Sequence, residues 1–151
     1  MAEVLDIFTK NGEKIGTISK KEYYSLERQA PWIKCVTCFV IDEKNKKILF
    51  EKRGNTEIDS GRLDLCSGHV KSGEAPIFTM TRELSEELGI EIEPSKLKSL
   101  GIVKVDYNGL SDITNRKNMR CITHIYGCKI SDPKEIQIDK QEVVRHRMVI
   151  F

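Results

Sequence analysis

Residues 68–90 read GHVKSGEAPIFTMTRELSEELGI and contain signals for the start and the end of a helix. Pro76 suits the first turn of a helix and Gly89 suits a left-handed stop, so the stretch predicts a helix over residues 76–88. At about 100° per residue, four apolar side chains share one stripe of that helix and should face a hydrophobic core. They are Ile77, Met80, Leu84 and Leu88.

Three glutamates crowd an arc beside this stripe. Glu83 lies three residues before Glu86 and four before Glu87, and like charges at these spacings destabilise a helix by ~0.2–0.5 kcal/mol per pair. The acids also lie toward the C-terminal end, where the helix dipole disfavours negative charge. A hard divalent cation such as Mg²⁺ or Mn²⁺ would reverse the sign of both effects. A solvated helix face is the alternative, and the surrounding spacing discriminates between them.

The surrounding residues fit one longer pattern at every defined position. Gly68 is followed by five residues and Glu74, then by seven residues and RELSEELGI at 82–90. This resembles the Nudix box, G-x5-E-x7-R-E-U-x-E-E-x-G-U, where U is a bulky aliphatic residue. The chain is therefore identified as a member of the Nudix hydrolase family, and the resemblance implies a MutT-like, divalent-metal-dependent pyrophosphohydrolase.

The resemblance also implies roles for individual residues. Arg82 would hold Glu74 and orient the glutamates without touching an ion. Bound Mg²⁺ or Mn²⁺ would neutralise phosphate oxygens and lower the pKa of an attacking water. The substrate would be a nucleoside diphosphate linked to another group, and its identity is not encoded in the box. The implied metal ligands are the carbonyl of Gly68 and the carboxylates of Glu83, Glu86 and Glu87.

Residues outside the box are weaker candidates. The family places its general base variously, and Glu142 is one downstream possibility. Lys52, Arg53 and Arg62 could contact substrate phosphates. A plain solvated basic surface is the alternative interpretation for these three side chains.

The remaining sequence predicts a single α+β domain over residues 1–151. Asn11-Gly12 between two short apolar runs indicates an N-terminal β-hairpin. Ser19 is a candidate cap for a helix that ends before Pro31. The resemblance implies an α/β/α sandwich around a mixed β-sheet. Strands are expected at residues 32–42, 46–53, 62–70, 98–107, 119–130 and 142–151.

The usual C-terminal helix of the family has no counterpart in this sequence. Either residues 19–29 cover the second face of the sheet, or a neighbouring subunit does, or the sequence stops before its natural terminus. Because an uncovered apolar face is an association surface, we expect a homodimer.

Composition limits the expected partners and the expected cellular compartment. The net charge of +2 gives no reason to expect nucleic acid as a partner, and no apolar run approaches the ~18 residues of a membrane span. The N-terminus lacks the apolar segment of a signal peptide, and five cysteines in apolar segments suit a reducing cytoplasm. Cys35 and Cys38 have metal-like spacing, but residues three apart in a strand face opposite sides.

Two other functions compete with hydrolysis. Cys66 and His69 precede the box much as in isopentenyl-diphosphate isomerase, and the N-terminal segment is similar to that subgroup. Against this, the cysteine is one residue too far from the histidine, the strand from Trp32 lacks the isomerase's metal-binding histidine, and the box is complete. A non-catalytic nucleotide-binding Nudix module is the other alternative, but it would need neither the glutamates nor Arg82.

Overall fold

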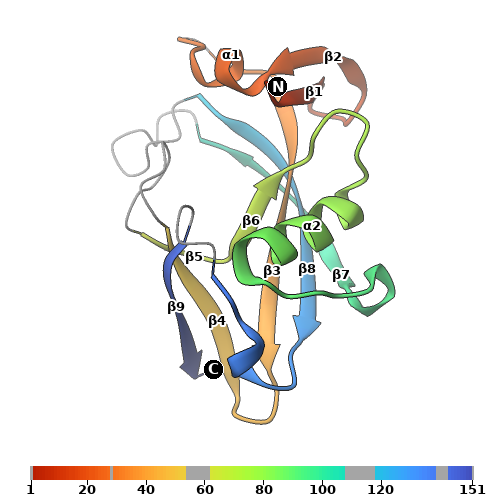
Figure 1. Ribbon diagram of the computed structural model, residues 1–151. Helices are drawn as coiled ribbons and strands as arrows, with labels where there is room; N and C mark the ends of the chain where they lie inside the picture. Colours follow the sequence, from red (N-terminus) through yellow and green to blue (C-terminus); the bar gives the residue numbers. More distant parts are fainter. Residues whose placement is uncertain (1, 28, 54–61, 108–117, 139–142, 151) are drawn as a thin grey trace.

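The computed structural model describes residues 2–27, 29–53, 62–107, 118–138 and 143–150 (Figure 1). Their strands form one mixed sheet, which confirms the predicted α+β class. None of the described helices is long and apolar enough to cross a membrane. The elements are β1 (Val4–Phe8), β2 (Lys14–Ser19), α1 (Lys20–Tyr24), β3 (Trp32–Asp42), β4 (Lys47–Arg53), β5 (Leu63–Asp64), β6 (Cys66–His69), α2 (Pro76–Leu88), η1 (Pro94–Lys96), β7 (Lys98–Asp106), β8 (Arg120–Lys129), η2 (Pro133–Glu135) and β9 (Val143–Ile150).

Strand β3 is the hub of the sheet. It pairs in parallel with β8 along most of its length and antiparallel with β1, β4 and β6. β7 extends the sheet antiparallel to β8, while β5 and β9 both pair with β4. The β3–β8 pair is the parallel component that makes the sheet mixed.

The main core lies between α2 and one face of β3. Alternate residues of β3, including Val36 and Val40, point toward the helix because successive strand residues face opposite sides. Met80, Leu84 and Leu88 are fully buried against them, and Ile77 is partly buried. The predicted apolar stripe is therefore confirmed.

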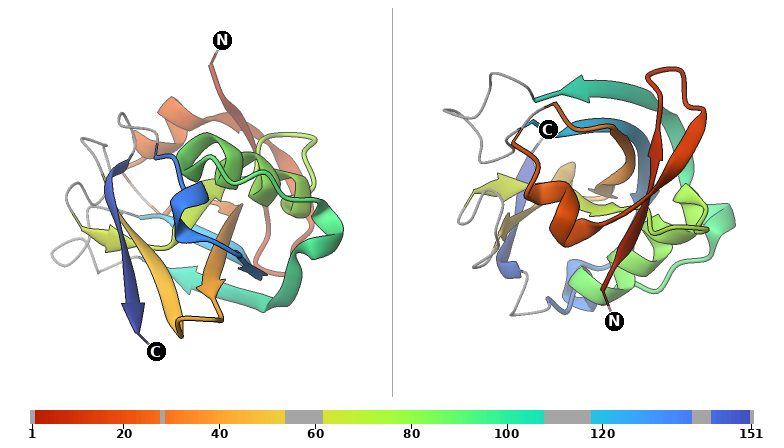
Figure 2. Two further views of the ribbon diagram at one scale, coloured as in Figure 1. Left: turned by 60° about the horizontal axis from the view of Figure 1, so that its bottom comes forward. Right: turned by 90° about the horizontal axis from the view of Figure 1, so that it is seen from above.

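The N-terminal segment lies across one end of the sheet (Figures 1 and 2), where it contacts residues of β3 that point away from α2. Tyr23 of α1 joins a second core cluster with Ile33 of β3 and Cys121 of β8. The two helices therefore pack on opposite faces of β3, as in the expected α/β/α arrangement. This is one of the three ways considered for covering the second face.

The hairpin and the cap of α1 match their predictions. Gly12 adopts φ 87° in the turn between β1 and β2, a left-handed conformation that glycine tolerates. The N–H of Glu22 donates to Ser19 Oγ at 3.2 Å, which caps α1.

Helix α1 ends earlier than predicted, at Tyr24. The chain beyond it is held by Asn118, whose side-chain nitrogen donates to the carbonyl of Leu26 at 3.2 Å. The carbonyl of Asn118 also accepts from the N–H of Ala30. Contacts with a distant segment therefore hold Leu26 and Ala30 outside the helix, although the sequence after Tyr24 has helical propensity.

The single strand predicted over residues 62–70 is two strands. β5 pairs with β4, whereas β6 pairs with β3. The break falls at Leu65, whose N–H donates to Asp64 Oδ1 at 2.8 Å. This change of partner carries Cys66 from the edge of the sheet into the core below α2. The predicted final strand is observed as β9.

Candidate active site

Helix α2 forms where the sequence predicts it, from Pro76 to Leu88. Gly89 ends it with φ 65°, and the N–H groups of Gly89 and Ile90 donate back to the carbonyls of Ser85 and Leu84. A Cβ at residue 89 would also lie 2.9 Å from Gln137 Cβ, so both conformation and space require glycine.

The three glutamates of α2 have different surroundings. Glu83 and Glu87 are buried, with 8% and 6% exposure, and face the sheet. The side chain of Glu86 is 54% exposed. A single helix arc therefore carries two buried carboxylates and one at the rim.

Gly68 of β6 lies directly against Glu83. A Cβ at residue 68 would lie 2.3 Å from both Cδ and Oε1 of Glu83, which no real side chain tolerates. The missing side chain of Gly68 therefore lets the backbone of β6 approach this carboxylate. The contact brings together the first residue of the box and the first glutamate of its acidic run.

Arg82 connects the loop before α2 to the acidic residues of the helix. Its Nε donates to Glu74 Oε1 at 3.0 Å and its Nη2 to Glu74 Oε2 at 3.1 Å. Its Nη1 donates to Glu83 at 2.9 Å and to Glu86 at 3.1 Å. Nη2 also approaches the carbonyl of His69 at 3.4 Å. One guanidinium therefore contacts four residues from three segments.

Glu74 is held on several sides. Thr79 Oγ1 donates to its Oε2 at 2.8 Å, in addition to the paired contact with Arg82. Burial alone would raise the pKa of Glu74, but the hydrogen bonds from Arg82 and Thr79 outweigh it and lower the pKa. Glu74 is therefore an ionised anchor for the arginine.

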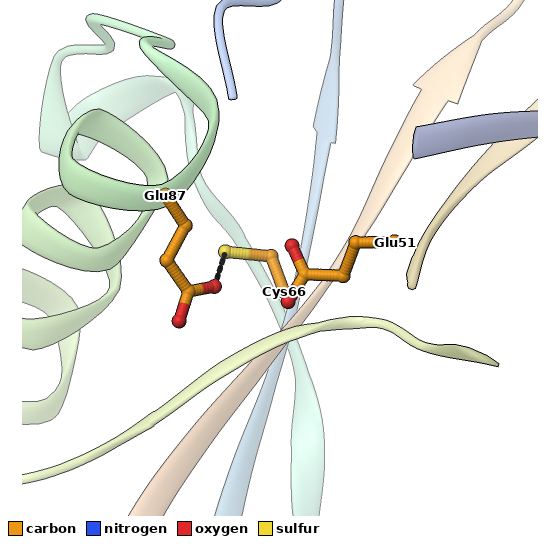
Figure 3. Close-up of side chains that lie close together, drawn as sticks. All are labelled: Glu51, Cys66 and Glu87. Atoms are coloured by element: carbon orange, nitrogen blue, oxygen red, sulfur yellow. Dashed lines mark hydrogen bonds between the residues drawn. The ribbon is translucent and has the colours of Figure 1, made fainter. Parts of the chain in front are cut away.

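Below Glu83, a thiol and two carboxylates converge (Figure 3). Glu87 reaches from α2 and Glu51 from β4 toward Cys66 of β6, and one ligand atom of each lies within 4.8 Å of the others. The Cys66 thiol donates to Glu87 Oε2 at 3.3 Å. Glu51 and Cys66 are 2% and 3% exposed.

Burial dominates the electrostatics of this cluster. It raises the pKa of Glu87 to about 10, and the neighbouring carboxylates of Glu51 and Glu83 contribute in the same direction. Burial likewise raises the pKa of the Cys66 thiol, again reinforced by the adjacent carboxylates. Several acidic groups thus share a space in which full ionisation requires a compensating cation.

Glu51 is the residue that the sequence analysis did not single out. Its signal was the alternation of β4, because residue 51 shares a strand face with the buried Leu49. A charged side chain at an inward-facing strand position is unusual and calls for a partner. The box pattern does not extend to β4 and so does not mark Glu51.

The other predicted residues lie elsewhere or outside the described chain. Lys52 is next to Glu51 in β4, so the two side chains point to opposite faces of the strand. Arg62 is exposed. The side chain of Arg53 and all of Glu142 lie outside the described residues.

Cys66 and His69 do not form an isomerase-like pair. They are three residues apart in β6 and therefore point to opposite faces. His69 Nε2 shares a hydrogen bond with the Tyr24 hydroxyl, and the two rings meet edge to face. The thiol instead faces Glu87, so no common site includes both side chains.

Comparison with known proteins gives consistent results. The family model described as the NUDIX domain matches residues 32–149. An uncharacterised Nudix hydrolase from Clostridium acetobutylicum is 33% identical over 146 residues, covering 94% of this chain and 67% of that relative. An isopentenyl-diphosphate Delta-isomerase from Photorhabdus laumondii is 30% identical over 101 residues, covering 66% of this chain and 55% of the isomerase.

The same fold is found in a solved structure. The crystal structure of DR0079 from Deinococcus radiodurans has a TM-score of 0.76 at 17% sequence identity, covering 98% of this chain and 83% of that one. At this identity the likeness concerns the fold alone.

Proposed function

This chain belongs to the Nudix family, and from that premise we propose that it hydrolyses the diphosphate linkage of a nucleoside diphosphate joined to another group. Its enzyme class is that of a Nudix pyrophosphohydrolase. The observation that carries the proposal is the assembled box, in which Arg82 joins Glu74 to the acidic face of α2 while Gly68 lies against Glu83. A helix with merely solvated acids would not need either contact.

Nudix hydrolases use divalent metal ions, and the donors present here suit Mg²⁺ or Mn²⁺. We assign the ligands to three carboxylates and one backbone carbonyl, a set of hard oxygen donors of the kind that these ions prefer. When bound, the ions would neutralise phosphate oxygens and lower the pKa of a water molecule. The assigned ligands are Gly68, Glu83, Glu86 and Glu87.

In this proposal Arg82 is a positioning residue. Its contacts to Glu83 and Glu86 hold both carboxylates, while its paired contact to Glu74 fixes the loop that follows β6. Positioning groups of this kind tune metal sites although they do not touch the ion.

The substrate contacts are proposed on charge alone. Lys52 and Arg53 end β4 and Arg62 directly precedes β5, and these cationic side chains would meet phosphate oxygens. Glu142 is our candidate for the general base that accepts the proton of the attacking water.

The isomerase alternative is less well supported. The opposite orientations of Cys66 and His69 separate the two side chains that such chemistry would require together. A purely nucleotide-binding module is also disfavoured, since it has no use for the arginine-braced carboxylates.

The test is a substrate screen with the purified chain and Mg²⁺ or Mn²⁺. Nucleotide sugars, dinucleotides, nucleoside triphosphates and alarmone-like diphosphates would be compared by phosphate release after phosphatase treatment. We expect metal-dependent turnover of at least one class and no interconversion of isoprenoid diphosphates. Isoprenoid interconversion without hydrolysis would replace the hydrolase by the isomerase.

We also propose a cytoplasmic location and a homodimer. All five cysteines are free, which suits a reducing compartment. Among the described strands β7 pairs with β8 alone, and its Leu100, Ile102 and Val103 are exposed. Exposed apolar side chains on such an edge favour association with a second copy.

A further inference from the structure

The cluster of Glu51, Cys66 and Glu87 contains a soft ligand that the oxygen-based metal site does not use. Its three side chains come from β4, β6 and α2, and all three are buried. Their ligand atoms lie within 4.8 Å of one another, and the Cys66 Sγ to Glu87 Oε2 distance is 3.3 Å. Three separate elements thus direct one thiol and two carboxylates to a common point.

We propose that this cluster binds a thiophilic divalent cation, with Zn²⁺ as the first candidate, through Cys66 Sγ and one oxygen each from Glu51 and Glu87. Thiolate ligands favour Zn²⁺ and heavier ions of the same group such as Cd²⁺, whereas Mg²⁺ favours oxygen ligands. The site therefore differs from the proposed catalytic metal site in ligand type, although the two share Glu87.

The distances suit a small tetrahedral ion. Zn²⁺ binds sulfur at roughly 2.3 Å and oxygen at roughly 2.0–2.2 Å, so neighbouring ligand atoms lie roughly 3.3–3.8 Å apart. The thiol and Glu87 already have this spacing at 3.3 Å. The other ligand atoms lie within 4.8 Å of one another, so Glu51 would have to move by no more than about 1.5 Å, which small rotations of a glutamate side chain can supply. Three protein ligands leave the fourth position open.

Charge balance also favours a cation here. Two carboxylates and a thiol are buried side by side here, and burying such groups without a compensating charge is costly. A divalent ion bound between them would supply that compensating charge. Burial of all three groups therefore strengthens the attraction to the ion once they ionise.

Occupation of the cluster has a functional consequence that rests on the proposed function. Because Glu87 would serve both sites, Zn²⁺ bound with Cys66 would withdraw a ligand from Mg²⁺ or Mn²⁺. Zn²⁺ should then inhibit hydrolysis, and excess Mn²⁺ should relieve the inhibition. Binding of Zn²⁺ itself does not depend on which reaction the enzyme performs.

The binding experiment uses Cd²⁺ as a probe, because a cadmium–thiolate bond has a charge-transfer absorption in the ultraviolet. The reduced, chelator-treated full chain is titrated with Cd²⁺, and its fold is checked by circular dichroism. We expect a saturable signal that Cys66→Ser and Cys66→Ala both abolish. Glu51→Gln should keep the signal but weaken binding at least ~10-fold, the smallest loss expected even for an outer partner of a metal.

Cys128→Ser is the matched control. Cys128 is also a buried core thiol, and its Sγ lies 3.7 Å from that of Cys38. Its replacement should leave the Cd²⁺ signal unchanged. A signal that survives both Cys66 variants, or that disappears with Cys128→Ser, would overturn the proposal, as would unchanged affinity in Glu51→Gln.

The experiments distinguish failure of the proposed Zn²⁺ site from failure of the proposed hydrolase activity. A Cys66-dependent Cd²⁺ signal in a protein that hydrolyses none of the screened substrates would support the thiophilic site and contradict the hydrolase. Hydrolysis with Mg²⁺ in a protein that shows no Cys66-dependent signal would support the hydrolase and contradict the thiophilic site. Loss of the Cd²⁺–thiolate absorption on adding Zn²⁺ would show that Zn²⁺ binds to the same cluster.

Discussion

Substitution of Glu86 or Glu87 is the most direct test of their assignment as metal ligands in catalysis. Replacing either by glutamine keeps the size of the side chain but removes the carboxylate that would bind the metal ion. We expect each variant to lower kcat by at least ~100-fold, the range for losing metal-assisted or acid–base catalysis. Turnover with Mg²⁺ is the measurement.

Glu93→Gln is the control for this pair. Glu93 is exposed and lies just beyond α2, so its replacement should leave turnover within a few-fold of the wild type. Activity that persists in excess chelator, or in both variants of the box, would contradict the metal-dependent mechanism.

Gly68 is the second residue whose replacement is informative. In Gly68→Ala the added Cβ collides with Glu83 Cδ at 2.3 Å, so the carboxylate or β6 must move. We expect lower stability and weaker Mn²⁺ binding, measured by the shift in melting temperature on adding Mn²⁺.

Gly12→Ala is the control that distinguishes general backbone strain from an effect on the contact between Gly68 and Glu83. Gly12 has φ +87° and open space around its Cα, so alanine there costs stability through the backbone alone. Its Mn²⁺-dependent shift should match that of the wild type. Equal shifts in the two variants would mean that the Gly68 contact does not shape the metal site.

The raised pKa of Glu87 predicts a pH dependence of the metal-free protein. Its carboxyl ionises near 4.5 when unfolded but at about 10 when folded, because burial and the neighbouring acids disfavour the charge. Between these values the folded state binds the additional proton, so this group makes stability fall as pH rises. Melting temperatures in chelator, measured from pH 5 to 9, should fall less steeply for Glu87→Gln than for the wild type. Parallel curves would contradict the burial argument.

At the scale of elements, the contacts of Arg82 join α2 to the loop of residues 70–74. An exposed i,i+4 pair with Glu86 alone would be worth only ~0.3–0.5 kcal/mol. The paired contact with Glu74 is less exposed, at 22% for Arg82 and 21% for Glu74, and includes two hydrogen bonds. Arg82→Ala should therefore lower the melting temperature more than Glu86→Ala, and should weaken Mn²⁺ binding without removing a ligand.

A double-mutant cycle tests the connection. Arg82→Ala and Glu74→Ala break the same contacts, so each should lose most of what the double variant loses. Melting temperatures are measured with and without Mn²⁺ for the four proteins. Additive effects together with an unchanged Mn²⁺ shift would show that the arginine does not position the metal ligands.

Local signals explain which elements the sequence predicted. Helix α2 has proline at its start, glycine at its end and an apolar stripe between them, and the hairpin has Asn11-Gly12. These features act over a few residues and can be read directly. The early end of α1 and the break at Leu65 depend instead on Asn118 and on a change of strand partner, which no short segment encodes.

The candidate site likewise contains residues that the sequence predicted and one that it did not. The resemblance to the Nudix box implied that Arg82 holds Glu74, and the structure has this contact. Glu51 lies in a strand outside the box, and its approach to Cys66 depends on how β4 and β6 are placed in the sheet. Strand alternation could have marked Glu51 as an inward-facing residue, but it carries no information on which side chains Glu51 meets.

At the scale of the whole molecule, the exposed edge at β7 predicts self-association. Its Leu100, Ile102 and Val103 are 51%, 58% and 45% exposed. Antiparallel pairing of two β7 strands about Ile102 would bring the exposed apolar side chains of both copies together. We expect a dimer by light scattering coupled to gel filtration.

Ile102→Glu should convert that dimer to a monomer, because it places two like charges at the centre of the paired strands. Ile15→Glu is the matched control, since Ile15 is equally exposed at 58% but lies in β2 at another position in the sheet. The control should remain dimeric with an unchanged melting temperature. A wild-type monomer at all concentrations, or equal dissociation by both variants, would exclude β7 as the interface. Within one chain, α1 would then be the element that covers this face of the sheet, where Tyr23 packs with Ile33 of β3.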